Sequence, residues 1–351
     1  MLAKLIGITK SIYHEISGVW FHKNKVDLGI QSKWSIFEKL NYNRLGFTNE
    51  DYYDFTLKHN DYHDYISFRE RWRLEYLNGR FSYILGEKLM FERIFGHYIR
   101  VPHINCWVKN GQCIDMEAGE QTDILPLLMV KKQLIAKPTR SGGGGAGIHK
   151  ILYDGSEYWV DQIKVSADEL KKTIASWEEY IVVDFVKQAE YSNCIYPETT
   201  NSMRVVTVKH KDNNYDVALA FHRFGSNFSF PVDNICSGGL VSLVDIEHGT
   251  LSVAKRATEP EIEYDKHPDT GTQIEGVEIS NWENIKDILI KTHQKFPYYI
   301  FLAWDVVIDD EGRINILEIN RGSDLNCQIV RPLRKEKIGL FMQEYGLLDR
   351  H

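Results

Sequence analysis

Residues 137–147 read Lys137-Pro-Thr-Arg-Ser-Gly-Gly-Gly-Gly-Ala-Gly147, directly after the apolar run Leu134-Ile-Ala136. Five glycines in one loop leave no Cβ atoms to hold a ligand away, so backbone N–H groups can converge on phosphate oxygens. A flexible surface loop without a ligand is the alternative interpretation. The stretch predicts a flap that covers phosphates, with Lys137 directly before it.

The residues that follow decide the type of loop. Ile148-His-Lys-Ile-Leu-Tyr153 has the pattern of a strand, Asp154-Gly155 that of a turn, and Glu157-Tyr-Trp-Val160 that of a second strand. A dinucleotide-binding glycine motif would open a helix instead, and a Walker A loop would end in Gly-Lys-Ser/Thr. The glycines are therefore expected in a β-hairpin.

A second informative stretch is the pair of apolar runs at residues 300–308 and 313–319, separated by Asp309-Asp-Glu-Gly312. We expect a hairpin in which Ile308 faces Arg313 and Asp305 faces Ile316. Side chains alternate along strands, so Asp305, Glu318 and Asn320 should share one face. Three oxygen donors suit Mg²⁺ or Mn²⁺. An ion pair between Asp305 and Arg204 or Arg223 is the alternative.

The net charge, the cysteines and the lengths of the apolar runs exclude some classes of function. The chain has 351 residues and a net charge of −7, which argues against a nucleic-acid partner bound through its phosphates. Its five cysteines are scattered and odd in number, as expected for reduced thiols in the cytoplasm. No apolar run approaches about 18 residues, so no membrane span is expected, and nothing resembles a signal peptide. The oligomeric state stays open.

The order of patterns predicts an α+β protein. Residues 1–80 form a helical N-terminal region, with helical patterns at 2–16, 34–40 and 68–77. Antiparallel hairpins predominate in the second half. Lys88 stands among the apolar positions of a helical pattern at 84–95, where it needs a route to solvent or an anion. Arg204 and Arg223 lie in strand patterns and could each serve either a phosphate or a carboxylate.

Three separated motifs carry a resemblance to a known superfamily. Lys137-Pro with the glycine loop, Asn201-Ser-Met-Arg204, and Asp305 with Leu317-Glu-Ile-Asn320 together resemble the ATP-grasp superfamily. The finer pattern is similar to the sugar-transfer-associated ATP-grasp family, through Asn201-Ser-Met-Arg-Val-Val-Thr207, Val232-Asp-Asn-Ile-Cys-Ser-Gly-Gly239, His267-Pro-Asp-Thr-Gly271 and Trp304-Asp305. The resemblance implies an ATP-grasp part with a glycine-rich lid at 81–183 and one with the metal-binding hairpin at 184–351.

The resemblance also implies a role for individual residues. The nucleotide would be bound by Lys88, Lys137, Ser141, Gly142, Gly143, Gly144, Gly145, Val183, Phe185, Glu190 and Arg204. Within this set Val183 and Phe185 would face adenine, and Glu190 would bind the ribose. Asp305, Glu318 and Asn320 would hold one or two Mg²⁺ ions, and Lys137, Arg204 and Arg223 would act in catalysis. Candidates for the acceptor side are Arg223, Asp233, Asn234, Gly238, Gly239, His267 and residues 321–324.

The activity that the resemblance implies is ATP-dependent ligation of a carboxylate to an amine through an acylphosphate. The carboxylate would belong to an acidic sugar or an amino-acid precursor in polysaccharide biosynthesis. A kinase that phosphorylates a small hydroxylated or phosphorylated metabolite shares the same nucleotide site and is the second hypothesis. The third is a nucleotide-binding regulator without turnover, which would have no need for a carboxylate at position 305 in an apolar strand.

Overall fold

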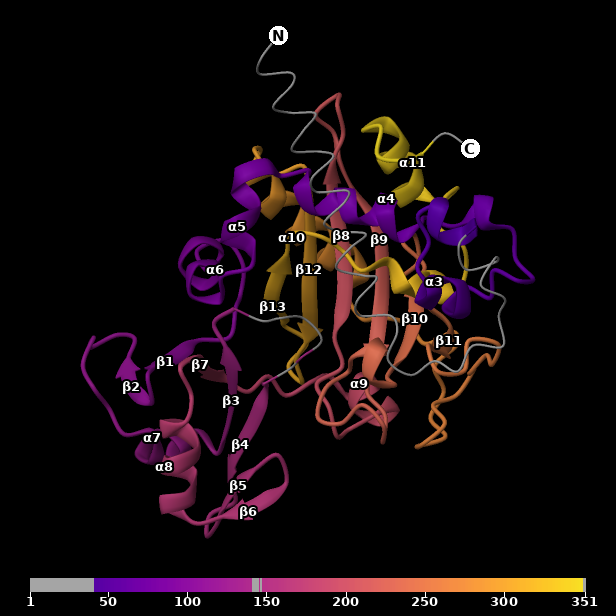
Figure 1. Ribbon diagram of the computed structural model, residues 1–351. Coiled ribbons are helices and arrows are strands. Elements are labelled where there is room, and N and C mark those ends of the chain that lie inside the picture. The colour runs from indigo at the N-terminus through magenta and orange to yellow at the C-terminus, as the bar shows by residue number, and fades with distance from the viewer. Residues whose placement is uncertain (1–40, 141–144, 146, 350–351) are drawn as a thin grey trace.

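The computed structural model describes residues 41–140, 145 and 147–349, and it contains two antiparallel sheets (Figure 1). The first sheet has the spatial order β2 (Gln112–Asp115), β1 (Ile104–Lys109), β7 (Glu179–Asp184), β3 (Gln133–Pro138), β4 (His149–Tyr153), β5 (Tyr158–Val160) and β6 (Ile163–Val165). The second has the order β11 (Leu251–Arg256), β10 (Leu240–Val244), β9 (Tyr215–Phe224), β8 (Met203–Lys209), β12 (Phe301–Ile308) and β13 (Ile314–Asn320).

Most of the described helices have fewer than ten residues. Their bounds are α3 (Asn49–Asp54), α4 (Phe68–Trp72), α5 (Ser82–Leu85), α6 (Lys88–Phe95), α7 (Ile124–Lys131), α8 (Ala167–Ala175), α9 (Glu190–Ile195), α10 (Trp282–Lys295) and α11 (Lys337–Glu344). The predicted α+β architecture is confirmed. None of the helices in residues 41–349 has the length and apolarity needed to cross a membrane.

The second sheet is buried on both faces, which explains the unbroken apolar runs of its strands. All eight residues of β12 are buried. On one face Trp304 packs with Phe95 of α6 and Leu289 of α10. On the other face Phe301 packs with Phe341 of α11 and with residues of the N-terminal region. The sheet is therefore the centre of the molecule.

Helices α7 and α8 cover one face of the first sheet. Leu128 of α7 and Ile174 of α8 pack on that face. The opposite face presents Ile181 and Val183, which pack with Leu89 of α6. The glycine loop joins β3 to β4, so the predicted hairpin is confirmed. This second face of the sheet borders the cavity described below.

The hairpin of β12 and β13 has a different register from the predicted one. Asp305 lies opposite Glu318 rather than Ile316, and Ile308 pairs with Ile314 rather than Arg313. The register shifts between Asp305 and Val306, as at a β-bulge. Arg313 belongs to the turn because its backbone N–H donates to the side chain of Asp309. The bulge still leaves Asp305 and Glu318 on the same face of the sheet.

The described part of the N-terminal region is helical, as predicted, and it docks on the second half of the chain. The backbone of Ile66 exchanges two hydrogen bonds with the Gln328 side chain, at 2.8 and 3.0 Å. The Glu70 carboxylate, which is fully buried, accepts from Arg334 at 2.8 Å. The predicted helices at residues 2–16 and 34–40 lie outside the described residues.

Replacement of Gln328 by methionine is expected to lower the free energy of unfolding by about 2 kcal/mol. The thioether fills a similar volume but leaves the buried N–H and C=O of Ile66 without partners. Urea denaturation measures the loss. Gln343→Met, on the exposed side of α11, is the matched control and should change stability by less than about 0.5 kcal/mol. Equal effects of the two substitutions would contradict the docking contact.

Candidate active site

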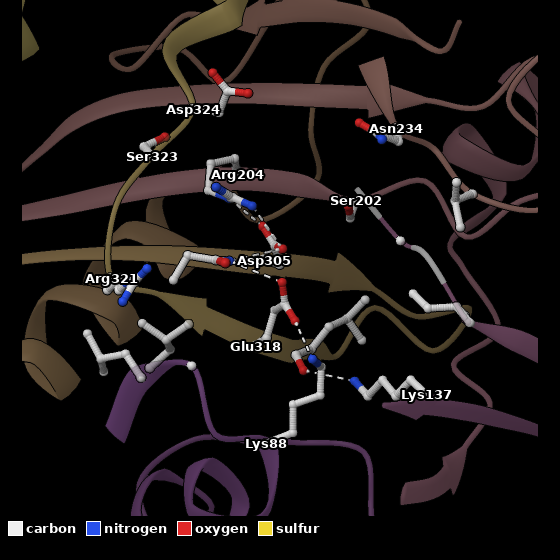
Figure 2. Close-up of a pocket in the computed structure, with 18 of the residues that line it drawn as sticks. Lys88, Lys137, Ser202, Arg204, Asn234, Asp305, Glu318, Arg321, Ser323 and Asp324 are labelled. Carbon is white, nitrogen blue, oxygen red and sulfur yellow. Dashed lines mark hydrogen bonds and ion pairs between the residues drawn. The ribbon is translucent and has the colours of Figure 1, made fainter. Parts of the chain in front are cut away.

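A cavity of about 890 Å³ lies where the two sheets and the N-terminal region meet. Strands β3 and β7 of the first sheet, strands β8, β9, β12 and β13 of the second, and helices α4 and α6 all contribute to its lining. Figure 2 shows its central part, with Lys88 and Lys137 on one side of Glu318 and Arg204 beyond Asp305. Segments that are about 180 residues apart in the chain thus face the same space.

Two buried lysines approach the hairpin of β12 and β13 from the first sheet and from α6. Lys137, at the end of β3, donates to the backbone oxygen of Leu317 at 3.3 Å. Lys88, the first residue of α6, places its Nζ 3.6 Å from Oε2 of Glu318. Only 6% of Lys88 and 9% of Lys137 are exposed. The anion that the sequence required for Lys88 is therefore Glu318.

Burial weakens the hold of Lys137 on its proton. Removal from water lowers its pKa from 10.5 to about 8. The carboxylate of Glu318 opposes this shift, and the nearby charge of Lys88 adds to it. A bound anion would restore the protonated form. Lys137 is thus protonated at neutral pH, and its charge above about pH 8 depends on what occupies the cavity.

Asp305 is the counter-ion of two arginines. Arg204, on the neighbouring strand β8, contacts both oxygens of Asp305, and its Nη2 donates to Oδ2 at 3.1 Å. Nη2 of Arg223 lies 3.3 Å from Oδ1 of the same carboxylate. Burial alone would raise the pKa of Asp305, but the two guanidinium groups outweigh burial and hold it well below its usual range. The ion pair that the sequence offered as an alternative is therefore formed.

The three predicted metal ligands converge. Nδ2 of Asn320 lies 3.2 Å from Oε1 of Glu318 and 3.4 Å from Oδ2 of Asp305. Within the described part of the chain, no group of three or more His, Cys, Asp and Glu side chains could hold a metal ion. Carboxylates and an amide oxygen are ligands that Mg²⁺ takes together with water and substrate phosphates, so the magnesium site stays a prediction.

Gly145 is one of the described glycines of the predicted phosphate loop, and it lines the cavity. Its φ of +75° is a conformation that side chains rarely adopt, and a Cβ there would lie 2.8 Å from Cγ1 of Val232. A glycine is therefore required where this loop meets the second half of the chain. The predicted contacts of Ser141, Gly142, Gly143 and Gly144 lie outside the described residues.

Two predicted nucleotide contacts are not brought to the cavity. Val183 lines it, but Phe185 does not, and the Phe185 ring packs instead beneath the ammonium group of Lys150 at 5.0 Å. Strand β7 ends at Asp184, so the alternation that would have aligned Phe185 with Val183 is broken. Glu190 begins α9 as an exposed residue and accepts a hydrogen bond from Cys194. Neither position supports the predicted adenine or ribose contact.

The acceptor candidates divide into two groups. Arg223, Asp233, Asn234 and residues 321–324 line the cavity, whereas Gly238, Gly239 and His267 do not. His267 is fully buried, its Nε2 lies 2.8 Å from the backbone oxygen of Gly225, and its ring stacks on Tyr196. Burial lowers its pKa, so this histidine is a neutral structural residue.

The sequence did not single out the residues of the N-terminal region that reach the cavity. Arg71, Trp72 and Glu75 line the cavity together with Phe68 and Glu50. The sequence contained a sign of this shared surface. Residues three and four positions apart lie on the same face of a helix, and this spacing relates Phe68, Arg71, Trp72 and Glu75. Arg71 is also salt-bridged, since its Nη2 lies 2.8 Å from Oδ1 of Asp51.

Two antiparallel sheets that enclose a cavity of lysines, arginines and oxygen donors define the class of protein as ATP-grasp, the fold that the sequence predicted. The family model for sugar-transfer associated ATP-grasp proteins matches residues 67–336. The chain belongs to this family. No curated protein matches the sequence.

Several solved structures are similar to this chain at low sequence identity. The ATP-grasp ligase PsnB, complexed with a minimal precursor, has 14% identity and a TM-score of 0.42 over 78% of this chain and 64% of that one. The N5-carboxyaminoimidazole ribonucleotide synthetase from Thermotoga maritima has 9% identity and a TM-score of 0.41 over 77% and 51%. An L-amino acid ligase from Bacillus licheniformis has 10% identity and a TM-score of 0.40 over 75% and 48%. The chain thus covers less than two thirds of the length of each.

Proposed function

We propose that this protein is an ATP-dependent carboxylate–amine ligase. A substrate carboxylate oxygen attacks the γ-phosphorus of ATP, the bond to the β-phosphate oxygen breaks, and an acylphosphate and ADP result. An amine nitrogen then attacks the acyl carbon, phosphate leaves with the bonding electron pair, and the ammonium proton passes to solvent. The product is an amide. Membership of an ATP-grasp family supports the use of ATP.

One observation supports this proposal more than any other. Lys88, Lys137, Arg204 and Arg223 line a single cavity, although they come from a helix and from strands of both sheets. Such a concentration of cations favours a polyanion, and the lysines approach from the opposite side to Arg204 (Figure 2). A triphosphate between them would contact cations along its length.

The arginines would supply the largest contribution to catalysis. A carboxylate and a triphosphate repel each other as they approach, and fixed positive groups in a site shielded from water offset that repulsion. Arg204 is fixed by Asp305, and Arg223 by Asp305 and by Asp233, whose Oδ2 lies 3.5 Å from Nε. Neither side chain needs to reorganise when charge develops on the transferred group.

Asp305, Glu318 and Asn320 would hold Mg²⁺, or Mn²⁺, together with the phosphates. The metal, when bound, would neutralise charge on the β- and γ-phosphates. Val183 with Ile135 would form an apolar wall for the adenine ring, since both line the cavity. The glycine-rich loop would cover the phosphates and keep water from the acylphosphate.

We infer that the substrate carboxylate belongs to an acidic sugar or an amino-acid precursor in polysaccharide biosynthesis, and the sugar-transfer association of the family supports the sugar. The test is ADP release from the purified chain with a panel of uronic acids, each with and without amines, followed by mass spectrometry. The ligase proposal requires that ADP release depend on both substrates and that an amide form. ADP release without an amine, with phosphate retained on the product, would establish the kinase hypothesis instead.

ATP affinity is expected to fall above about pH 8. Lys137 is protonated below its pKa of about 8 and loses its charge above it, so binding then requires uptake of a proton. The dissociation constant should rise by up to about tenfold for each pH unit above this value. Titration calorimetry with ATP measures the slope. A Lys137→Arg variant keeps its charge throughout, and an unchanged slope in that variant would assign the effect to another group.

A further inference from the structure

The cavity continues beyond the cations to a second end, which we call the acidic end. It is formed by α3, α4 and residues 321–326, and Glu50, Phe68, Arg71, Trp72, Ser323 and Asp324 line it. In Figure 2, Ser323 and Asp324 lie on the opposite side of Asp305 from Lys88 and Lys137. The N-terminal region thus adds a binding surface next to the proposed ATP site.

Two buried donors at the acidic end have no acceptor. Arg71 is 8% exposed; its Nη2 pairs with Oδ1 of Asp51, whereas its Nη1 has no hydrogen-bond partner in the described structure. Ser323 is 5% exposed, and its Oγ likewise lacks a partner among residues 41–349. Buried polar groups are nearly always satisfied, so both point to a ligand acceptor. A guanidinium group prefers a carboxylate.

The same end carries an excess of negative charge. Nε of Arg71 lies 3.9 Å from Oδ1 of Asp324, and Glu50 lines the cavity nearby. Burial, with a further contribution from the charges of Glu50 and Asp51, raises the pKa of the neighbouring Asp54 to about 8. A ligand with only a carboxylate would be repelled here. A ligand that also carries an ammonium group satisfies both sets of charges.

We propose that the acidic end binds the amine substrate and that this substrate is an amino acid. Its carboxylate accepts from Arg71 and Ser323, and its ammonium group faces the carboxylate of Asp324 and the nearby Glu50. Phe68 fixes the orientation of Arg71, since the guanidinium carbon lies 5.0 Å from the centre of the ring. Trp72 adds a buried indole N–H that has no acceptor within the described chain.

This inference rests on the proposed ligase activity because it supplies the nucleophile of the second step. The bound ammonium releases a proton to solvent through the exposed side of Asp324, whose side chain is 58% exposed. The neutral nitrogen then forms the bond to the acyl carbon, phosphate leaves with the bonding electron pair, and the second nitrogen proton passes to the departing phosphate. The amino acid would retain its carboxylate in the amide product.

Calorimetric titration of the full chain, saturated with ADP, tests the inference directly. The probes are alanine, glutamate, lysine and phenylalanine, each compared with the amine that lacks its carboxylate and the acid that lacks its amino group. At least one amino acid should bind, and both of its analogues should bind about tenfold more weakly or worse, because each loses a charge-assisted hydrogen bond. Failure of all four amino acids to bind, or binding of neutral sugars in their place, would overturn the inference.

Two variants locate the site. Arg71→Lys keeps the charge but loses the fork of donors, so amino-acid affinity should fall about tenfold while ATP affinity stays constant. Arg69→Lys is the matched control on the same helix, because Arg69 pairs with Asp349 rather than lining the cavity. Ser323→Ala should weaken binding severalfold. An equal effect of the two lysine substitutions would refute the role of Arg71.

The experiment separates the two proposals. If an amino acid binds in an Arg71-dependent manner but no carboxylate in the panel yields an amide, the acidic end is assigned correctly and the ligase proposal is wrong. If amides form only with amines that lack a carboxylate, the ligase proposal stands and the inference about the amino acid is wrong.

Discussion

Replacement of Glu318 by glutamine is expected to slow ADP formation about a hundredfold while the protein stays folded. The substitution keeps the size of the side chain and removes the negative charge that faces both lysines and a bound cation. A correctly held metal ion stabilises the charge of the transition state by several kcal/mol. A loss of about 2.7 kcal/mol of this stabilisation would slow the reaction about a hundredfold, since each 1.36 kcal/mol corresponds to about a tenfold change in rate. The side chain of Glu318 is 27% exposed, so the cost to stability should be about 1 kcal/mol or less.

The dependence on Mg²⁺ distinguishes this explanation from a general loss of structure. In the Glu318→Gln variant the concentration of Mg²⁺ for half-maximal ADP formation should rise, while ATP alone should bind as well as before or more tightly, because an anionic group has been removed. Glu311→Gln, in the turn of the same hairpin, is the matched control, since Glu311 pairs with Arg313 outside the cavity. Full turnover in the Glu318→Gln variant would refute the metal assignment.

The sequence predicted those parts of the site that local pattern determines. The order of strand, glycine loop and strand places Lys137 next to the flap, and the spacing of Glu318 and Asn320 puts both on one face of β13. Lys88 could be recognised as anomalous because a charge in an apolar helical pattern needs a partner. The identity of that partner, more than 200 positions away, followed only from the packing of α6 on the second sheet.

The errors arose where tertiary contacts or irregular backbone override the pattern. The bulge between Asp305 and Val306 shifts the register of β12 and β13, and no residue type in the hairpin signals it. Strand β7 stops before Phe185, so extrapolating its alternation failed. The role of Arg71 depends on the docking of α4 against residues 321–326. The bulge, the end of β7 and the position of Arg71 all depend on contacts between segments that are distant in the chain. Such contacts cannot be predicted from the local pattern of a single sequence.

Asp305→Leu is expected to destabilise the protein by about 3–5 kcal/mol. The substitution leaves Arg204, whose side chain is 9% exposed, buried without its bidentate partner, and an uncompensated buried charge is the costly consequence of breaking such a pair. Arg223 retains Asp233 and is affected less. Urea denaturation measures the loss. Asp287→Leu, which breaks an exposed pair with Lys291, should cost less than about 1 kcal/mol and serves as the control.

The double variant Arg204→Met with Asp305→Leu should be more stable than Asp305→Leu alone, because removal of both charges removes the desolvation cost as well. Its ADP formation should nevertheless be lost, since Arg204 and Asp305 would both be missing from the phosphate site. Recovered stability without recovered activity would show that the pair is kept for its charges in the cavity rather than for the fold. A double variant as unstable as the single one would mean that Asp305 stabilises the sheet through contacts other than those to Arg204.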